Sequence, residues 1–145
     1  PDIKLYVYGS KMPESISELE TENIKMVGFA ESLDDVFNNH KLFVAPLLSG
    51  AGIKGKVLEA MAYGTPSVVT DVAAEGTGLV NNVNAVITNN ASDFAAAIVD
   101  LYSDNEKCQN FSEATRILSA DKFSRSSGLA KFREIFESVG LYTTR

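Results

Sequence analysis

Residues 42–70 read L-F-V-A-P-L-L-S-G-A-G-I-K-G-K-V-L-E-A-M-A-Y-G-T-P-S-V-V-T, and the rest of the chain can be interpreted as scaffold around them. An apolar run closed by Pro46 comes first, a glycine-rich loop and a helical pattern follow, and a second apolar run begins after Pro66. At the start of such a helix, free backbone N–H groups and the positive end of the helix dipole form a ready site for an anion, usually a phosphate. Lys54 and Lys56 add formal positive charge at the same place.

The same alternation of strand and helix patterns continues on both sides of this stretch. Strands are expected at residues 3–8, 24–27, 42–45, 67–70 and 85–87, and helices at about 14–21, 32–38, 55–63, 92–102, 104–120 and 124–139, with a loop over 71–84. Strands that alternate with helices form a parallel sheet with helices on both faces, so the sequence predicts a Rossmann-like α/β fold. Ligands of such sheets bind outside the carboxyl ends of the strands. Four of the expected loops meet there, at residues 9–10, 28–29, 49–55 and 70–76.

The composition bounds the class of protein. A chain of 145 residues with 45% apolar residues suits one domain with an ordinary core, and a net charge of −6 argues against nucleic acid as a partner. With one histidine, His40, placed before a strand, and one cysteine, Cys108, placed within a helix, we expect no catalytic triad, metal cluster or internal disulfide. The adjacent acids Asp34 and Asp35 are expected to face solvent in different directions.

The ends of the chain and its hydropathy suggest a location. No apolar run is long enough to span a membrane and no signal-peptide pattern opens the chain, so the expected location is the cytoplasm. The sequence starts directly on a strand without an initiator methionine. We therefore expect a fragment of a longer protein.

Two familiar glycine patterns overlap in the loop, and both fail on their context. Residues 50–55 match the G-x-G-x-x-G fingerprint of dinucleotide-binding folds, with Asp71 near the place of the ribose-binding acid. That fingerprint should follow the first strand of its fold, whereas two strand–helix units precede it here. Residues 50–56 also match a phosphate loop, but Val57 replaces the Ser or Thr that would hold Mg²⁺.

A third pattern fits in both order and spacing. The motifs are V-Y-G at 7–9, N-I-K-M-V-G at 23–28, F-V-A-P at 43–46, L-E-A-M-A-Y-G-T-P-S-V-V-T at 58–70, A-E-G at 74–76 and F-S at 123–124. Together they resemble the C-terminal, donor-binding domain of GT-B-fold glycosyltransferases of family 4, also called group 1. The resemblance covers nearly the whole chain. It implies that residues 1–145 are one nucleotide-sugar donor-binding domain, the C-terminal half of a GT-B fold without its first strand–helix unit, and a fragment of a larger two-domain protein.

The resemblance also implies which residues contact the donor. The expected contacts are Gly28, Phe29, Ala51, Gly52, Ile53, Lys54, Leu58 and Glu59. In the family, a glutamate at the position of Glu59 hydrogen-bonds the ribose hydroxyls. We expect the helix to bury Val57, Leu58, Met61 and Ala62, which leaves Glu59 on the opposite side. The alternative for Glu59 is a plain surface ion pair with Lys56, which would be worth about 0.2–0.5 kcal/mol.

The other expected contacts have alternatives as well. Lys54 and the amides of Gly52 and Ile53 are candidates for the diphosphate, because positive charge there stabilises the leaving group; the alternative is that both lysines are simply solvated. The turn at Gly28 and Phe29 resembles the base-binding turn of the family, and the alternative for Phe29 is an ordinary core residue.

The sequence departs from the family pattern at three places. Ala51 stands where the family often has a glutamate that contacts the donor sugar, and Leu48 stands where a related subgroup often has arginine. The phosphate-binding Arg and Lys of the family would precede residue 1. Sugar recognition should therefore differ or be weaker in this chain, and the catalytic residues cannot be assigned.

The function that the resemblance implies is retaining transfer of a sugar, of the hexosyltransferase type, from a nucleotide diphosphate sugar to an acceptor. It implies no essential metal, no cofactor beyond the donor substrate, and a role in the synthesis of a polysaccharide or glycoconjugate. The acceptor site would lie in the protein's own N-terminal domain, absent here, so the isolated chain should bind nucleotide weakly and be inactive. The longer protein would act in the cytoplasm and could associate peripherally with the inner face of the membrane. A non-catalytic nucleotide-binding module and an NAD-binding Rossmann domain remain as alternatives.

Overall fold

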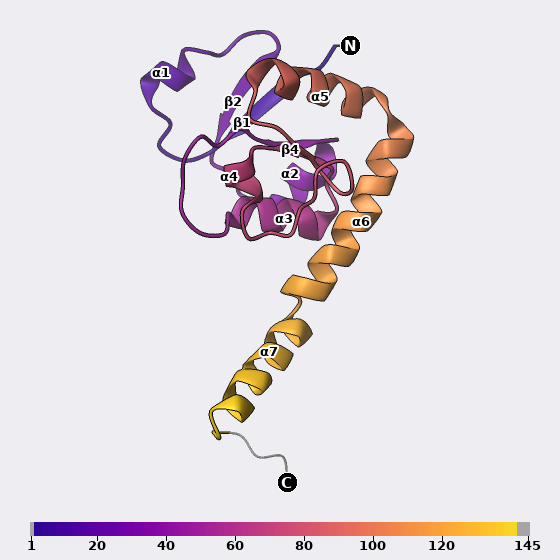
Figure 1. Cartoon of the computed structure of the whole chain (residues 1–145). Helices are drawn as coiled ribbons and strands as arrows, with labels where there is room; N and C mark the ends of the chain where they lie inside the picture. The colour runs from indigo at the N-terminus through magenta and orange to yellow at the C-terminus, as the bar shows by residue number, and fades with distance from the viewer. Residues whose placement is uncertain (1, 142–145) are drawn as a thin grey trace.

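The computed structural model describes residues 2–141, and it is an α/β protein (Figure 1). The strands are β1 (Leu5–Tyr8), β2 (Ile24–Gly28), β3 (Phe43–Ala45), β4 (Ser67–Val69) and β5 (Val86–Ile87). The helices are α1 (Glu14–Ser17), α2 (Leu33–Asn39), α3 (Gly55–Tyr63), α4 (Asp71–Ala74), α5 (Ala91–Ser103), α6 (Asn105–Phe123) and α7 (Arg125–Ser138). Every strand lies where the sequence predicts it, and α3 has the predicted bounds.

Two helices differ from the prediction. The first is shorter than expected, because Ile16 and Leu19 stay exposed and a short polar helix without packing rarely extends beyond one turn. The second, α4, occupies the start of the segment that we expected to be a loop. It forms because the hydroxyl of Thr70 accepts a hydrogen bond from the Ala73 N–H at 3.3 Å and so caps a single turn.

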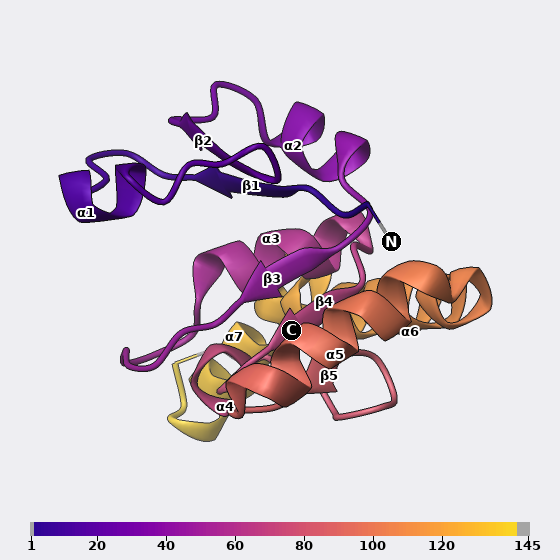
Figure 2. The ribbon, with the colours of Figure 1, turned by 90° about the horizontal axis from the view of Figure 1, so that it is seen from above.

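The strands are parallel, as predicted, but among residues 2–141 they form two separate sheets. One sheet contains β1 and β2, and the other has the order β3-β4-β5. Figure 2 shows the five strands in the order β2, β1, β3, β4, β5, with α3 and α5 on opposite sides of the β3-β4-β5 sheet. The predicted helices on both faces are therefore confirmed.

Two buried clusters hold this sheet between its helices. On one face, Ala45 and Val69 pack with Val57 and Met61 of α3; on the other, Val68 packs with Leu101, Cys108 and Phe111 of α5 and α6. Parallel sheets need apolar residues on both faces, and the run S-V-V-T supplies them.

Helix α3 is fixed at both ends. It buries Val57, Ala60 and Met61, which have the i, i+3, i+4 spacing of one helical face, whereas Ala62, expected to be buried, is exposed. Gly64 ends the helix with φ at 69°, a conformation that favours glycine. The guanidinium of Arg116 in α6 donates to the Tyr63 carbonyl at 3.0 Å, so α6 holds the C-terminal end of α3.

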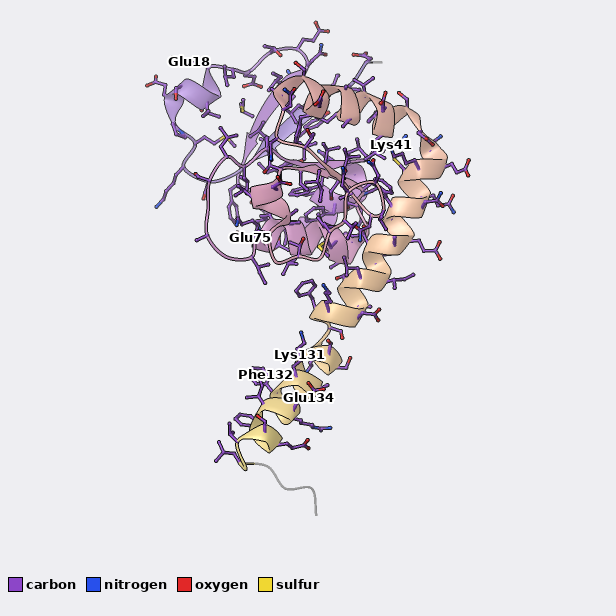
Figure 3. All side chains as sticks on the ribbon, viewed as in Figure 1. Glu18, Lys41, Glu75, Lys131, Phe132 and Glu134 are labelled. Atoms are coloured by element: carbon purple, nitrogen blue, oxygen red, sulfur yellow. The ribbon has the colours of Figure 1, made fainter. Side chains whose placement is uncertain are left out.

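The last helix leaves the body of the molecule. Figures 1 and 3 show α7 extending away from the sheets, with Phe132 on its exposed surface. Its apolar side chains are exposed at Leu129, Phe132, Ile135, Phe136 and Val139. Within residues 2–141, no helix combines the length and the hydropathy that crossing a bilayer requires.

Candidate functional site

The candidate site lies at the start of α3, where the glycine-rich loop after β3 enters the helix. The strands β1 and β3 run in the same direction in Figure 2, so the loops that follow them emerge on the same side of the molecule. The loops after β2 and β4 share that side, because β2 is parallel to β1 and β4 is parallel to β3. The rim predicted from the sequence is therefore present, although two sheets build it.

The first turn of α3 offers free backbone donors. The residue before the helix, Lys54, has extended backbone angles and its side chain makes no capping hydrogen bond. The amides of Val57 and Leu58 both donate to the Lys54 carbonyl, at 3.0 and 3.2 Å. The amides of Gly55 and Lys56, one step earlier in the chain, therefore remain for a partner outside the helix. The first turn also carries no acidic side chain that would compete with an anion.

The glycines of the loop have different roles. Gly52 has φ at 71°, in the left-handed region that favours glycine, so the path of the loop requires it. Gly55 has no such conformation, and a Cβ built on it would meet no other atom within 4 Å. Among the described residues, neither backbone conformation nor crowding therefore requires a glycine at 55, and the space beside it is open.

Lys54 is turned back on its own loop. Its Nζ donates to the carbonyl of Gly52 at 2.5 Å and lies 3.5 Å from the carboxylate of Glu75, and its side chain is only 12% exposed. Glu75 follows α4, on the side of the molecule where α3 also lies (Figure 3). The alternative of a fully solvated side chain therefore does not hold for Lys54, whereas Lys56 stays mostly exposed and pairs only with Glu59. The ammonium of Lys54 is here a structural tie between two rim loops, and Glu75 partly compensates its charge.

The rest of the loop is open. Ala51, Gly52 and Ile53 are exposed, and a Cβ on Gly76 would lie 2.8 Å from the Ile53 side chain, so the turn after α4 supports Ile53 closely. Leu58 is half-buried and packs against the core cluster beneath α3. Of the residues predicted to contact the donor, Leu58 therefore lies largely on the core side.

Glu59 lies one turn into α3 with its side chain 34% exposed. Its Oε2 is 2.8 Å from Nζ of Lys56, whose own side chain is mostly exposed. The surface ion pair that we considered as the alternative is therefore present, but it engages one oxygen and leaves the carboxylate accessible. An exposed pair of this kind contributes little to stability and is easily rearranged by a ligand.

Phe29 is not a core residue. It is 75% exposed, so the core alternative is wrong, and it follows Gly28, whose φ of 82° turns the chain. Phe29 borders a hollow of about 250 Å³ between the end of β2 and α2, to which Tyr8, Ser32 and His40 also contribute. A second hollow of about 370 Å³ lies near the start of α6, and neither is lined by residues 49–64.

The remaining titratable side chains have structural roles. Asp34 is not simply solvated, because it accepts a hydrogen bond from the Tyr63 hydroxyl, and this bond raises the pKa of Tyr63 above 10.0. Burial raises the pKa of the Cys108 thiol, which donates to the Leu101 carbonyl at 3.0 Å. His40 contacts the rings of Tyr6 and Tyr8. In residues 2–141, no cluster of His, Cys, Asp and Glu has the geometry to hold a metal ion.

Two residues near the candidate site are not singled out by the sequence. In the sequence Glu75 belongs only to the A-E-G motif, yet in the structure it makes the long-range contact to Lys54. Gly55 is one glycine of a pattern in the sequence, and the structure adds that its surroundings are open. The A-E-G motif shortly after a strand could have indicated Glu75. No feature of the neighbouring sequence indicates the open surroundings of Gly55.

Comparison with known proteins identifies the family. The model of the family described as "Glycosyl transferases group 1" matches residues 1–104. A 44.6 kDa protein in the cps region of Klebsiella pneumoniae is 32% identical over 114 residues, which is 72% of this chain and 29% of that protein.

Solved structures show the same fold. Anabaena Alr3699/HepE in complex with UDP superposes with a TM-score of 0.82 at 16% identity, over 95% of this chain and 42% of that chain. The sucrose-phosphate synthase of Thermosynechococcus elongatus gives 0.80 at 17% identity, over 94% and 38%. A mutant of S. aureus TarM in complex with Fondaparinux, alpha-GlcNAc-glycerol and UDP gives 0.78 at 23% identity, over 92% and 29%. The chain thus spans less than half the length of each of these proteins.

Proposed function

The chain belongs to the group 1 glycosyl transferases, and from this premise we propose that it binds a nucleotide diphosphate sugar at the start of α3 and presents it for transfer to an acceptor. The observation that carries the proposal is the free first turn of α3, with open space at Gly55 and an accessible carboxylate at Glu59. That UDP is bound in a solved structure of the same fold supports it.

The diphosphate is the group that the helix start can hold. The amides of Gly55 and Lys56 point out of the first turn, and the helix dipole adds a partial positive charge. When the bond between sugar and phosphate breaks, negative charge grows on the diphosphate. Donors that are already fixed in place stabilise this charge without rearranging, which lowers the barrier to transfer.

Glu59 is the group that can hold the pentose. A carboxylate accepts hydrogen bonds only, so two neighbouring hydroxyls of a ribose are suitable donors for its two oxygens. Lys56 already holds one oxygen at 2.8 Å, and binding would exchange or share this contact. The exposed ring of Phe29 and the turn at Gly28 would then meet the nucleobase, and the exposed Ala51, Gly52 and Ile53 would face the sugar and diphosphate.

The finer parts of the proposal concern the longer protein. We propose retaining hexosyl transfer in polysaccharide or glycoconjugate synthesis, with the acceptor bound by an N-terminal domain, in the cytoplasm or at the inner face of the membrane. The relative encoded in a cps region supports the polysaccharide role. Because helix amides supply the stabilisation of the leaving group, we expect a chelator such as EDTA to leave transfer unchanged.

A non-catalytic nucleotide-binding module is the second candidate, and one observation favours it. Ala51 cannot form the contact to the donor sugar that the family glutamate makes, so binding could persist without turnover. The two candidates differ in turnover. When the longer protein that contains residues 1–145 is titrated with nucleotide sugars, release of the nucleotide diphosphate indicates a transferase, and binding without release indicates a non-catalytic module.

The test of the site is calorimetry with UDP, GDP, ADP and NAD on the wild type and on Glu59→Gln. The amide keeps the shape and one acceptor but loses the charge, so affinity for the preferred nucleoside diphosphate should fall by about tenfold, which is about 1.4 kcal/mol. Glu113→Gln on the exposed surface of α6 is the matched control and should bind as the wild type does. Unchanged binding by Glu59→Gln, or preferred binding of NAD, would contradict the proposed site.

A further inference from the structure

The loop before α3 presents apolar side chains to solvent. It covers residues 46–54, reads P-L-L-S-G-A-G-I-K, and projects beyond the end of β3 in Figure 2. Leu48 is 88% exposed and Ile53 is 51% exposed, and Leu47 and Ala51 are exposed as well. Single exposed apolar side chains are common on proteins, but several within one short loop beside a candidate ligand site form a patch that a ligand can cover.

Contacts with the rest of the protein hold this apolar patch in place. The Thr70 hydroxyl, just after β4, donates to the Leu47 carbonyl at 2.6 Å and so fixes the start of the loop. At its other end, a Cβ built on Gly76 would lie 2.8 Å from the Ile53 side chain, so the turn after α4 supports Ile53. Because both ends are fixed, a ligand can meet the patch without first paying to order the loop.

The loop has few hydrogen-bonding groups left for a ligand that is rich in hydroxyls. Its only polar side chains are those of Ser49 and Lys54. The ammonium of Lys54 already donates to the Gly52 carbonyl at 2.5 Å and lies 3.5 Å from the Gly50 carbonyl. The Leu47 carbonyl is engaged by Thr70. A hydroxyl that is placed over the patch would therefore lose water and find few replacements, which is unfavourable.

One accessible acceptor lies beside the loop. The carboxylate of Glu75 is 3.5 Å from Nζ of Lys54, and its side chain is 64% exposed (Figure 3). Both oxygens of a carboxylate accept hydrogen bonds, so Glu75 can bind neighbouring hydroxyls while it stays close to Lys54. The surroundings thus combine one carboxylate with an apolar patch.

The proposed function places the sugar of the donor over this loop. In a nucleotide diphosphate sugar, the diphosphate joins the pentose at one end to the transferred sugar at the other. If the amides of Gly55 and Lys56 hold the diphosphate, and Glu59 holds the pentose one turn further into α3, the sugar lies at the opposite end. That end is the loop before the helix.

A 6-deoxyhexose matches these surroundings better than an ordinary hexose does. It carries a methyl group in place of CH2OH and keeps neighbouring hydroxyls on its ring. The methyl group gains by leaving water for an apolar patch, whereas the hydroxyl of CH2OH would be left there without a partner. An acetamido group also ends in a methyl group, but its N–H and C=O would need partners as well.

On the basis of the proposed function, we propose that the sugar of the donor is a 6-deoxyhexose. Its methyl group packs on the apolar patch, against Leu48, Ala51 and Ile53, and Glu75 accepts hydrogen bonds from its ring hydroxyls. The diphosphate and the pentose keep the partners that the proposed function gives them.

Calorimetry with matched pairs of donors tests the sugar directly. The longer protein that contains residues 1–145 is titrated with its preferred nucleoside diphosphate linked to D- or L-glucose, mannose or galactose, and with the 6-deoxy form of each. The two members of a pair differ by one oxygen atom. In at least one pair the 6-deoxy donor should bind at least about tenfold more tightly, because an apolar surface leaves the extra hydroxyl unpaired.

Two variants show whether the apolar patch causes this preference. Leu48→Asn replaces an exposed apolar side chain by a polar one of similar shape and should reduce the preference to about threefold or less. Val83→Thr is the matched control and should keep the full preference. Val83 is 58% exposed in the loop before β5, which is parallel to β4, so it lies at the opposite ends of the strands from the site.

The possible outcomes separate this proposal from the proposed function. If the hydroxylated donors bind as tightly as their 6-deoxy forms in every pair, or more tightly, the 6-deoxy sugar is refuted while the nucleotide site stands. A preference that survives in Leu48→Asn refutes the role of the patch. A loss of stability in Leu48→Asn without a change in preference means that another part of the longer protein covers the patch, which also refutes it. If no nucleoside diphosphate binds, or if Glu59→Gln binds as the wild type does, both proposals fail.

Discussion

The open space in front of Gly55 leads to a prediction in which stability and binding move in opposite directions. Gly55 is the first residue of α3, has no left-handed conformation, and would place a Cβ where no atom lies within 4 Å. Gly55→Ala should therefore fold without strain. Alanine is favoured over glycine by up to about 1 kcal/mol within a helix, and by less at the first position, so the free energy of unfolding should rise by about 0.5 kcal/mol.

Binding of a nucleoside diphosphate should nevertheless weaken. If the diphosphate accepts hydrogen bonds from the amides of Gly55 and Lys56, its oxygens lie about 2.9 Å from those nitrogens, where the new methyl group projects. Losing one charged hydrogen bond and displacing the phosphate should cost about 1.5–3 kcal/mol, which is at least a tenfold loss of affinity.

The assay combines thermal unfolding with calorimetric titration of UDP, GDP and ADP. Gly128→Ala is the matched control, because Gly128 in α7 also lacks a left-handed conformation and meets no atom within 4 Å, yet lies far from the site. Both variants should be at least as stable as the wild type, and only Gly55→Ala should bind less tightly. A stable Gly55→Ala protein with undiminished affinity would refute the assignment of the diphosphate to this helix start.

Three further predictions follow from contacts away from the helix start. Glu75→Gln removes the carboxylate that lies 3.5 Å from Nζ of Lys54, and so loosens the contact between the two rim loops. Titration should show a threefold to tenfold weaker nucleotide affinity, with little change in thermal stability. An affinity equal to that of the wild type would contradict this role of Glu75. Thr115→Val removes the donor to the Asn84 carbonyl, a buried bond of 2.9 Å, and chemical denaturation should show a loss of about 1–3 kcal/mol, whereas binding by the folded variant should be unchanged. The hydrogen bond to Asp34 raises the pKa of Tyr63 above the model-compound value of 10.0, so its stabilising effect is present below pH 10 and is lost as the pH rises through the higher folded value. Phenolate absorbance of wild type minus Tyr63→Phe should show this late titration, and Asp34→Asn should move it to lower pH; identical curves for Asp34→Asn and wild type would exclude Asp34 as the cause.

The local features of this protein could be predicted from the sequence because near neighbours determine them. The bounds of α3 follow from the glycine-rich loop before residue 55 and from Gly64 and Pro66 after the helix, and the structure has the same bounds. The family was recognisable for the same reason, since the motif from residue 58 to 70 combines a helix, its glycine end and a buried strand in one continuous stretch.

The single turn of α4 shows where this reasoning stops. A Thr cap followed by three residues is too weak a pattern to distinguish from a loop, and here the burial of Ala73 in the core stabilises the turn that Thr70 caps. The role of Lys54 was likewise beyond a local pattern. Its charge predicts a phosphate ligand, and only the structure adds that its ammonium contacts the Gly52 carbonyl and a carboxylate 21 residues away.

Hydrophobic periodicity, glycine conformations and capping act over a few residues, so the sequence alone was enough to predict the strands, every helix except α4, the glycine-rich turn before α3, and the family. Only the tertiary structure decided that Phe29 is exposed, that Tyr63 bonds Asp34, and that β1 and β3 stay unpaired. These features depend on which distant segments come together. That depends on how the whole core packs, and no short stretch of sequence contains this information.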